Sequence, residues 1–164
     1  ISPEKLKFSS YNEGENKDLE AKVKITRTPT IAILDKDGNY SGLKYSSLPS
    51  GHELNSFILG LYNVAGPGQK VTAESLEKIE KINKPVNIKI GISLSCTKCP
   101  KTVQATQRIA TLNKNVEMEM INIFTFQDFK NRYDIMSVPA IIVDDQHIYF
   151  GEKTVEDVLE IINK

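Results

Sequence analysis

The sequence predicts an α/β fold in which two related units follow one another along the chain and share a mixed central sheet flanked by helices. Short apolar strands alternate with segments of helical periodicity over most of the chain. Each half contains the same order of features, in which a proline (Pro29, Pro139) is followed by an apolar strand, a turn, a second strand, a glycine-containing break and a helix. The two cysteines, Cys96 and Cys99, lie at a predicted strand-to-helix junction in the second half.

Composition limits the class of protein. With 164 residues, 40% of them hydrophobic, the chain is large enough for one domain or two small ones. Lysine plus arginine and aspartate plus glutamate number 21 each, so neither nucleic acid nor an anionic membrane is expected as the main partner. No apolar run approaches the roughly 18 residues of a membrane span, and no signal peptide precedes Ile1. We therefore expect a soluble, cytoplasmic protein that is a piece of a longer one.

The first unit, residues 1–68, is predicted to contain a hairpin followed by an amphipathic helix. Thr30–Leu34 is a nearly all-apolar run, and the Asp-Gly pair that follows it favours a tight turn into a return strand over residues 39–45. The helix is expected to begin near Ser50. It is indicated by apolar residues at helical spacing, namely Leu54, Phe57, Ile58, Leu61, Tyr62 and Ala65.

The ends of this first unit are less regular. Residues 5–9 alternate apolar and polar side chains, as a half-buried strand does, whereas residues 20–25 are compatible with either pairing or coil. Residues 66–68, Gly-Pro-Gly, end the helix and mark the domain boundary. Because the unit has no counterpart of the first strand, the first helix and the cysteine pair of the second, we expect it to be truncated at its N-terminus.

The second unit, residues 69–164, is predicted to be complete. Its expected elements are a helix capped by Thr72, a strand over 86–93, a helix from Pro100 to Asn113, a strand over Val116–Asn122, a short helix over 125–132, strands at Ala140–Val143 and His147–Phe150, and a last helix capped by Thr154.

The cysteine pair is predicted to be a dithiol redox centre. Cys96 comes first, where the helix N-terminus favours its thiolate and lowers its pKa, and Cys99, one turn further on, should be less exposed. In a reducing compartment a lone CxxC is catalytic or metal-binding more often than structural. A zinc site needs about four ligands, and His52 and His147 lack ligand spacing, so no metal is expected.

Other residues have both a functional and a structural interpretation. A proline that begins a central strand removes a ladder donor, and we expect Pro139 to be cis and to face the cysteines, with Pro29 as its structural echo. Lys98 either supports negative charge on Cys96 or is a solvated surface lysine. Glu53 either suits a helix start or moves protons to and from the resolving sulfur, provided that burial raises its pKa.

Four segments carry a family resemblance: residues 50–54, 93–100, 125–127 and 136–140. They resemble the thioredoxin superfamily, and in particular the N-terminal tandem thioredoxin-like domain of the flavoprotein alkyl hydroperoxide reductase, a peroxiredoxin reductase. The match covers nearly the whole chain, apart from a strand and a helix with which the family's domain begins. The sequence is also similar, less closely, to glutaredoxin-like protein disulfide oxidoreductases with tandem folds.

The resemblance implies a thiol–disulfide exchange domain that relays electrons from a flavoprotein reductase module to the disulfide of a peroxiredoxin. FAD and NADH are then expected on a downstream module, with no cofactor on this chain. The resemblance also implies the roles of individual residues: Cys96 attacks, Cys99 resolves, Glu53 is an acid lent by the first unit, and Thr97, Lys98, Val138 and Pro139 contact the substrate. The alternatives are a free-standing disulfide oxidoreductase and a non-enzymatic docking or metal-binding module.

Overall fold

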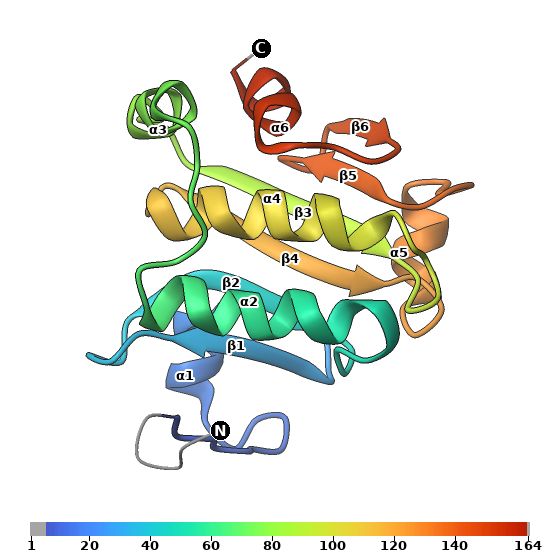
Figure 1. Ribbon diagram of the computed structural model, residues 1–164. Helices are drawn as coiled ribbons and strands as arrows, with labels where there is room; N and C mark the ends of the chain where they lie inside the picture. The colour runs from blue at the N-terminus through green and yellow to red at the C-terminus, as the bar shows by residue number, and fades with distance from the viewer. Residues whose placement is uncertain (1–5, 164) are drawn as a thin grey trace.

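The computed structural model describes residues 6–163, which form a single six-stranded sheet in the order β1-β2-β4-β3-β5-β6 (Figure 1). The strands are β1 (Thr30–Leu34), β2 (Tyr40–Ser46), β3 (Val86–Ile92), β4 (Val116–Asn122), β5 (Ala140–Val143) and β6 (His147–Phe150). The helices are α1 (Lys17–Lys22), a short 3-10 helix η1 (Gly51–Glu53), α2 (Leu54–Ala65), α3 (Ala73–Glu80), α4 (Cys99–Leu112), α5 (Gln127–Arg132) and α6 (Val155–Ile162).

The sheet is mixed and continuous across the two units, as the sequence predicts. β2 of the first unit pairs in parallel with β4 of the second, with Leu43 opposite Met118 and Tyr45 opposite Met120. β3 pairs in parallel with β4, whereas the β1–β2, β3–β5 and β5–β6 pairs are antiparallel. Because the central strands belong to both units, their apolar side chains form one shared core.

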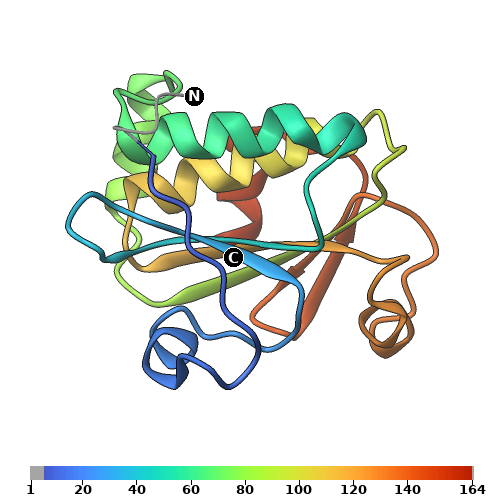
Figure 2. The same cartoon turned by 90° about the horizontal axis from the view of Figure 1, so that it is seen from below.

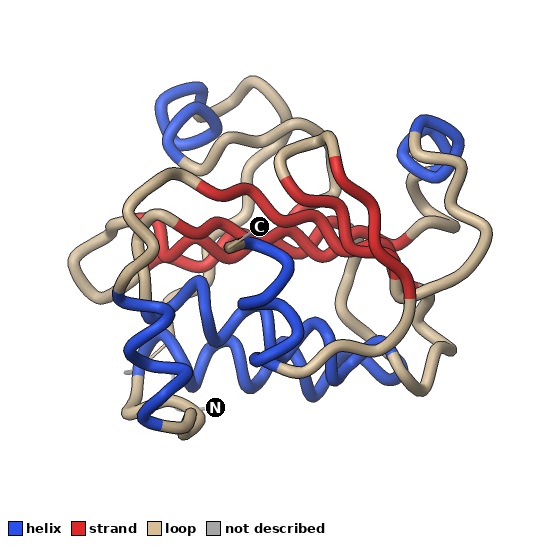
Figure 3. Tube along the Cα trace, turned by 90° about the horizontal axis from the view of Figure 1, so that it is seen from above, coloured by secondary structure: helices blue, strands red, loops and turns tan. Residues whose placement is uncertain are grey.

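Helices cover both faces of the sheet. α2, α3, α4 and α6 lie on one face, and α1 and α5 lie on the other, near opposite ends (Figures 2 and 3). The larger core fills the space between the sheet and the first group, where Tyr45, Ile90 and Met118 are fully buried. A smaller core around Phe129 lies beneath α5. Within the described residues, no helix is long and apolar enough to cross a membrane.

The predicted repeat extends to backbone geometry. Lys24 after α1 and Asp134 after α5 stand 110 positions apart and both have positive φ, 54° and 46°. Both X-Pro bonds, at Pro29 and Pro139, are cis, as predicted. The same backbone hydrogen bonds follow in each unit: Ile25 N to Glu20 O (2.9 Å) and Ile135 N to Lys130 O (3.0 Å), then Ser47 N to Pro29 O (2.9 Å) and Gly151 N to Pro139 O (3.0 Å).

Two local predictions for the first unit are wrong. Residues 6–9 form no strand, and Lys5 lies outside the described residues. These residues are exposed, with Phe8 78% accessible, because no described strand lies beside them to pair with their backbone. The ambiguous segment at 20–25 is the end of helix α1 and the turn after it.

The buried face of α2 also differs from the predicted one. Leu54, Ile58 and Tyr62 are about half exposed, and the buried positions are Ser56, Gly60 and Asn63. The reason is that α2 packs alongside α4 as well as on the sheet. A Cβ on Gly60 would lie 2.1 Å from the Tyr45 hydroxyl oxygen, so this close approach requires the smallest residue, not an apolar one.

Candidate active site

The cysteine pair lies where the sequence places it, between the end of β3 and the start of α4. Cys96 and Cys99 are joined by a disulfide with their Cα atoms 5.5 Å apart. The Cys99 backbone N–H, in the first turn of α4, donates to Cys96 Sγ at 3.1 Å. A thiolate formed there on reduction would keep this donor and face the positive end of the helix. The local fold therefore stabilises negative charge on Cys96.

The two sulfurs differ in access. Cys99 is fully buried in the larger core, whereas Cys96 is half-buried and lines a pocket. Only the first of the two can meet a bulky partner without movement of the fold. This asymmetry matches the predicted order of reaction, with Cys96 outermost.

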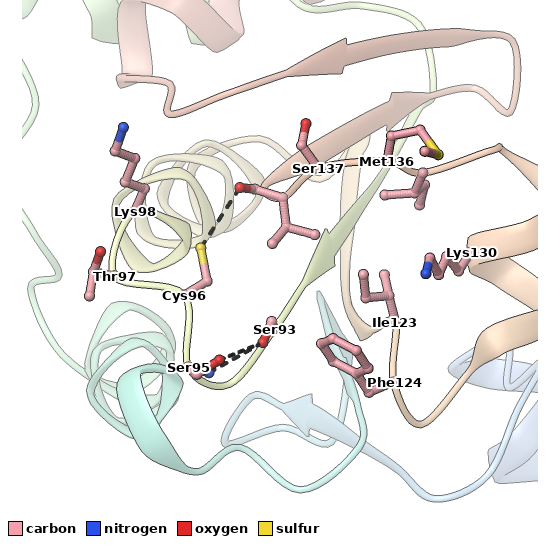
Figure 4. A pocket seen from close by; sticks show the side chains of 12 residues that line it. Ser93, Ser95, Cys96, Thr97, Lys98, Ile123, Phe124, Lys130, Met136 and Ser137 are labelled. Atoms are coloured by element: carbon pink, nitrogen blue, oxygen red, sulfur yellow. Dashed lines mark hydrogen bonds between the residues drawn. The ribbon is translucent and has the colours of Figure 1, made fainter.

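The segment before β5 forms the wall opposite Cys96. Pro139 is buried, and the Val138 carbonyl oxygen lies 3.9 Å from Cys96 Sγ (Figure 4). In the disulfide the sulfur carries no hydrogen, so this is a contact; in the dithiol state the thiol can donate to the carbonyl. Thr97 and Lys98 are exposed beside Cys96, and Lys98 immediately precedes α4.

The first unit reaches the active-site loop through η1. The His52 backbone N–H donates to the Leu94 carbonyl oxygen at 3.1 Å, two residues before Cys96. Gly51 has φ +55°, and a Cβ there would lie 2.5 Å from the same oxygen. A glycine is thus required for η1 to approach this loop so closely.

Glu53, at the end of η1, is fully buried. Neither carboxylate oxygen has a hydrogen-bond partner among the described residues. Burial raises the pKa of Glu53 to about 7, and the Ser56 hydroxyl opposes only part of that shift. A carboxyl group with this pKa exchanges its proton near neutral pH, as a proton-transfer group must.

A buried polar network joins the two units beside this carboxyl group. The Tyr45 hydroxyl donates to Gln107 Oε1 at 2.7 Å, and Gln107 Nε2 donates to the Ser56 carbonyl oxygen at 3.0 Å. Buried hydrogen bonds of this kind fix the relative position of the groups that make them. The network thereby holds the start of α2, and with it Glu53, against α4.

A pocket of about 520 Å³ opens beside Cys96 (Figure 4). Its lining includes Thr97, Lys98 and Val138, which the sequence analysis selected. It also includes residues that the sequence analysis missed: Ser93, Ser95, Ile123, Phe124, Lys130, Ile135, Met136 and Ser137. They come from the end of β3, the loop after β4, helix α5 and the segment before Pro139. The missed signal is positional, since the proline and the end of β4 are visible in the sequence.

Neither histidine belongs to this site. His52 and His147 are both exposed and lie on different elements. Within residues 6–163, no three His, Cys, Asp or Glu side chains gather as metal ligands would.

Comparison with known proteins gives a consistent result. A sequence model of the family described as "Thioredoxin domain" matches residues 86–163. The alkyl hydroperoxide reductase AhpF of Staphylococcus epidermidis is 31% identical over 151 residues, which are 89% of this chain but 29% of that protein. The chain thus spans less than a third of the length of this relative.

Two solved structures are similar. The NTD_N/C domain of alkylhydroperoxide reductase AhpF from Enterococcus faecalis is 39% identical, with a TM-score of 0.89 over 93% of this chain and 73% of that one. A protein disulfide oxidoreductase from Aeropyrum pernix has a TM-score of 0.81 over 91% of this chain and 64% of that one, at 22% identity. The second likeness shows a shared fold alone.

Proposed function

Because this chain belongs to the family of N-terminal domains of the alkyl hydroperoxide reductase AhpF, we propose that it is a thiol–disulfide oxidoreductase domain that relays electrons from a flavoprotein reductase module to the disulfide of a peroxiredoxin. The observation that carries the proposal is the Cys96–Cys99 disulfide, with the Cys99 N–H directed at Cys96 Sγ. FAD and NADH belong, in this proposal, to another module of the longer protein.

The reaction is two thiol–disulfide exchanges. In the reduced domain the Cys96 thiolate attacks one sulfur of the partner's disulfide, forms a mixed disulfide and releases the partner's other sulfur as a thiolate. Cys99 then loses its proton and attacks Cys96 Sγ, which releases the partner's first sulfur as a second thiolate. The partner gains two electrons, and Cys96 and Cys99 are again joined as in this structure.

Glu53 is the proposed acceptor of the Cys99 proton. Both groups are fully buried, so water gives little help at this step. A carboxyl group with a pKa of about 7 can take the proton as Cys99 attacks and return it afterwards. We also propose the division into residues 1–68 and 69–164, in which the first unit has no cysteine and contributes this carboxyl group through η1.

Four residues are proposed to contact the partner: Thr97, Lys98, Val138 and Pro139. Thr97 and Lys98 are exposed next to Cys96, and the Val138 carbonyl oxygen lies 3.9 Å from its sulfur. A disulfide that approaches Cys96 must pass between these two walls.

A trapping experiment tests the proposal. Cys99→Ser is expected to attack a peroxiredoxin disulfide through Cys96 and then to stop, leaving a covalent adduct that dithiothreitol reverses. Cys96→Ser is the matched control and is expected to give no such adduct, because its remaining sulfur is buried. If Cys99→Ser forms no adduct with any peroxiredoxin, the proposed substrate is wrong.

A further inference from the structure

The pocket beside Cys96 has a chemical character that thiol–disulfide exchange itself does not explain. Its rim carries two of the most exposed apolar side chains of the described chain, Phe124 (65% accessible) and Met136 (83%). Exposed apolar side chains around a concave site are typical of surfaces that bind another protein. Both lie on the side of the pocket away from Thr97 and Lys98 (Figure 4).

The charge of the pocket is one-sided. The lining contains Lys98 and Lys130 and no aspartate or glutamate. Within residues 6–163, neither lysine has a carboxylate within 4.0 Å, so both ammonium groups are free to meet charge from outside. Lys130 projects from α5 toward the pocket, across from Cys96 (Figure 4).

The repeat supplies an internal comparison. In the first unit, Glu20 and Thr26 stand 110 positions before Lys130 and Met136. The backbone hydrogen bond from Ile25 to Glu20 matches the one from Ile135 to Lys130. This turn therefore forms with a glutamate and a threonine at those positions. The fold alone requires neither the cation nor the exposed methionine, and both occur in the unit that has the cysteines.

We propose that this pocket selects the partner, by receiving an extended peptide segment next to the partner's reactive cysteine that carries an apolar side chain and a carboxylate. The apolar side chain lies between Phe124 and Met136, and the carboxylate pairs with Lys130. The inference rests on the proposed function, because the segment must be continuous with the disulfide that Cys96 attacks. It names three specificity-determining residues beyond those predicted to contact the substrate.

Short cysteine peptides activated as mixed disulfides with thiopyridine provide the test. The reduced protein attacks the peptide sulfur through Cys96, and thiopyridine leaves as thiopyridone after taking a proton from water. Cys99 then displaces the peptide thiolate and restores the Cys96–Cys99 disulfide. The release of thiopyridone, followed by absorbance, gives the second-order rate constant of the first step.

The peptide series places a leucine or a glycine beside the cysteine, and Glu, Gln or Lys at successive positions further along. For the wild-type protein at low ionic strength, the best glutamate peptide is expected to react about fivefold faster than its lysine counterpart, the ratio typical of one exposed charge pair. This preference should shrink at physiological salt. Replacing leucine by glycine is expected to slow the reaction severalfold, and less so in Phe124→Ala and Met136→Ala.

Charge reversal at Lys130 gives the sharpest comparison. Lys130→Glu is expected to reverse the order, so that the lysine peptide reacts faster. The matched control is Lys84→Glu, an exposed lysine before β3, at the opposite end of that strand from Cys96. It makes the same change in net charge and is expected to keep the wild-type order.

The outcomes separate the two proposals. Neutral dithiodipyridine should react equally fast with all variants, which shows that fold and dithiol are intact. If it reacts but Lys130→Glu keeps the wild-type preference, or Lys84→Glu reverses it equally well, the pocket proposal is overturned and the proposed function stands. If the reduced protein attacks no disulfide at all, both fall together.

Discussion

Replacing Glu53 by glutamine is expected to remove most of the pH dependence of stability that this buried carboxyl group creates. Its pKa of about 7 in the folded protein stands against 4.5 for a free carboxyl group. Below pH 4.5 both the folded and the unfolded chain keep the proton. As the pH rises toward 7 the unfolded chain releases it first, so the free energy of unfolding falls, by roughly 3 kcal/mol in total.

Urea unfolding of the oxidised protein at pH 5 and pH 8 measures this effect. The free energy of unfolding of Glu53→Gln, relative to wild type, should rise by roughly 2 to 3 kcal/mol between the two pH values. The cost of a buried amide without partners is the same at both, and it cancels in this difference. Glu80→Gln, at an exposed carboxyl group on α3, is the control and should show no comparable change.

The reasoning fails on a clear result. If Glu53→Gln changes stability equally at pH 5 and pH 8, the carboxyl group is already ionised in the folded protein at pH 5. A proton acceptor with a pKa near 7 would then be absent from the site. The role proposed for Glu53 in the second exchange would fall, while the roles of the cysteines would be unaffected.

Three further outcomes follow from packing and access. Gly60→Ala should destabilise the protein by about 1 to 3 kcal/mol in urea unfolding, although alanine favours helices, because its Cβ would lie 2.1 Å from the Tyr45 hydroxyl oxygen; a gain in stability would contradict the close helix contact. Gly51→Ala should lower the free energy of unfolding by a similar amount, through positive φ and a clash with the active-site loop, and an unchanged value would show that η1 is not tightly docked. In the reduced native protein, iodoacetamide should modify Cys96 before the fully buried Cys99, as mass spectrometry of peptides can show; equal labelling would contradict the asymmetry of access.

Most of the second unit could be predicted from sequence because its local signals agree with its tertiary contacts. Thr72 and Thr154 cap helices as expected, with hydrogen bonds from Ser75 N and Asp157 N. The alternation in β3 corresponds to real alternation of burial up to Lys89. Where pattern, cap and packing favour the same structure, a single sequence is sufficient.

The wrong predictions have one physical cause, which is that pairing and packing partners decide burial. The alternation in residues 6–9 is that of a strand, but the described chain offers it no neighbour. The apolar stripe of α2 suggested the wrong buried face because α4 requires small and polar residues at the contact, such as Ser56 and Gly60. Helix α1 was detectable, since it stands 110 positions before α5 in the same repeat that identifies Pro29 and Pro139.

That repeat also separates what the fold needs from what the site needs. Both units share the cis-proline, the positive-φ residue and the backbone bonds around them, so these features belong to the fold. The residues that differ between the units, Cys96 and Lys130 among them, lie around one pocket. The first unit keeps the framework without thiols, and η1 places Glu53 beside the active-site loop of the second. A chain with one site has therefore a reason to retain two folds, because the buried carboxyl group and the dithiol come from different units and meet only when both pack together.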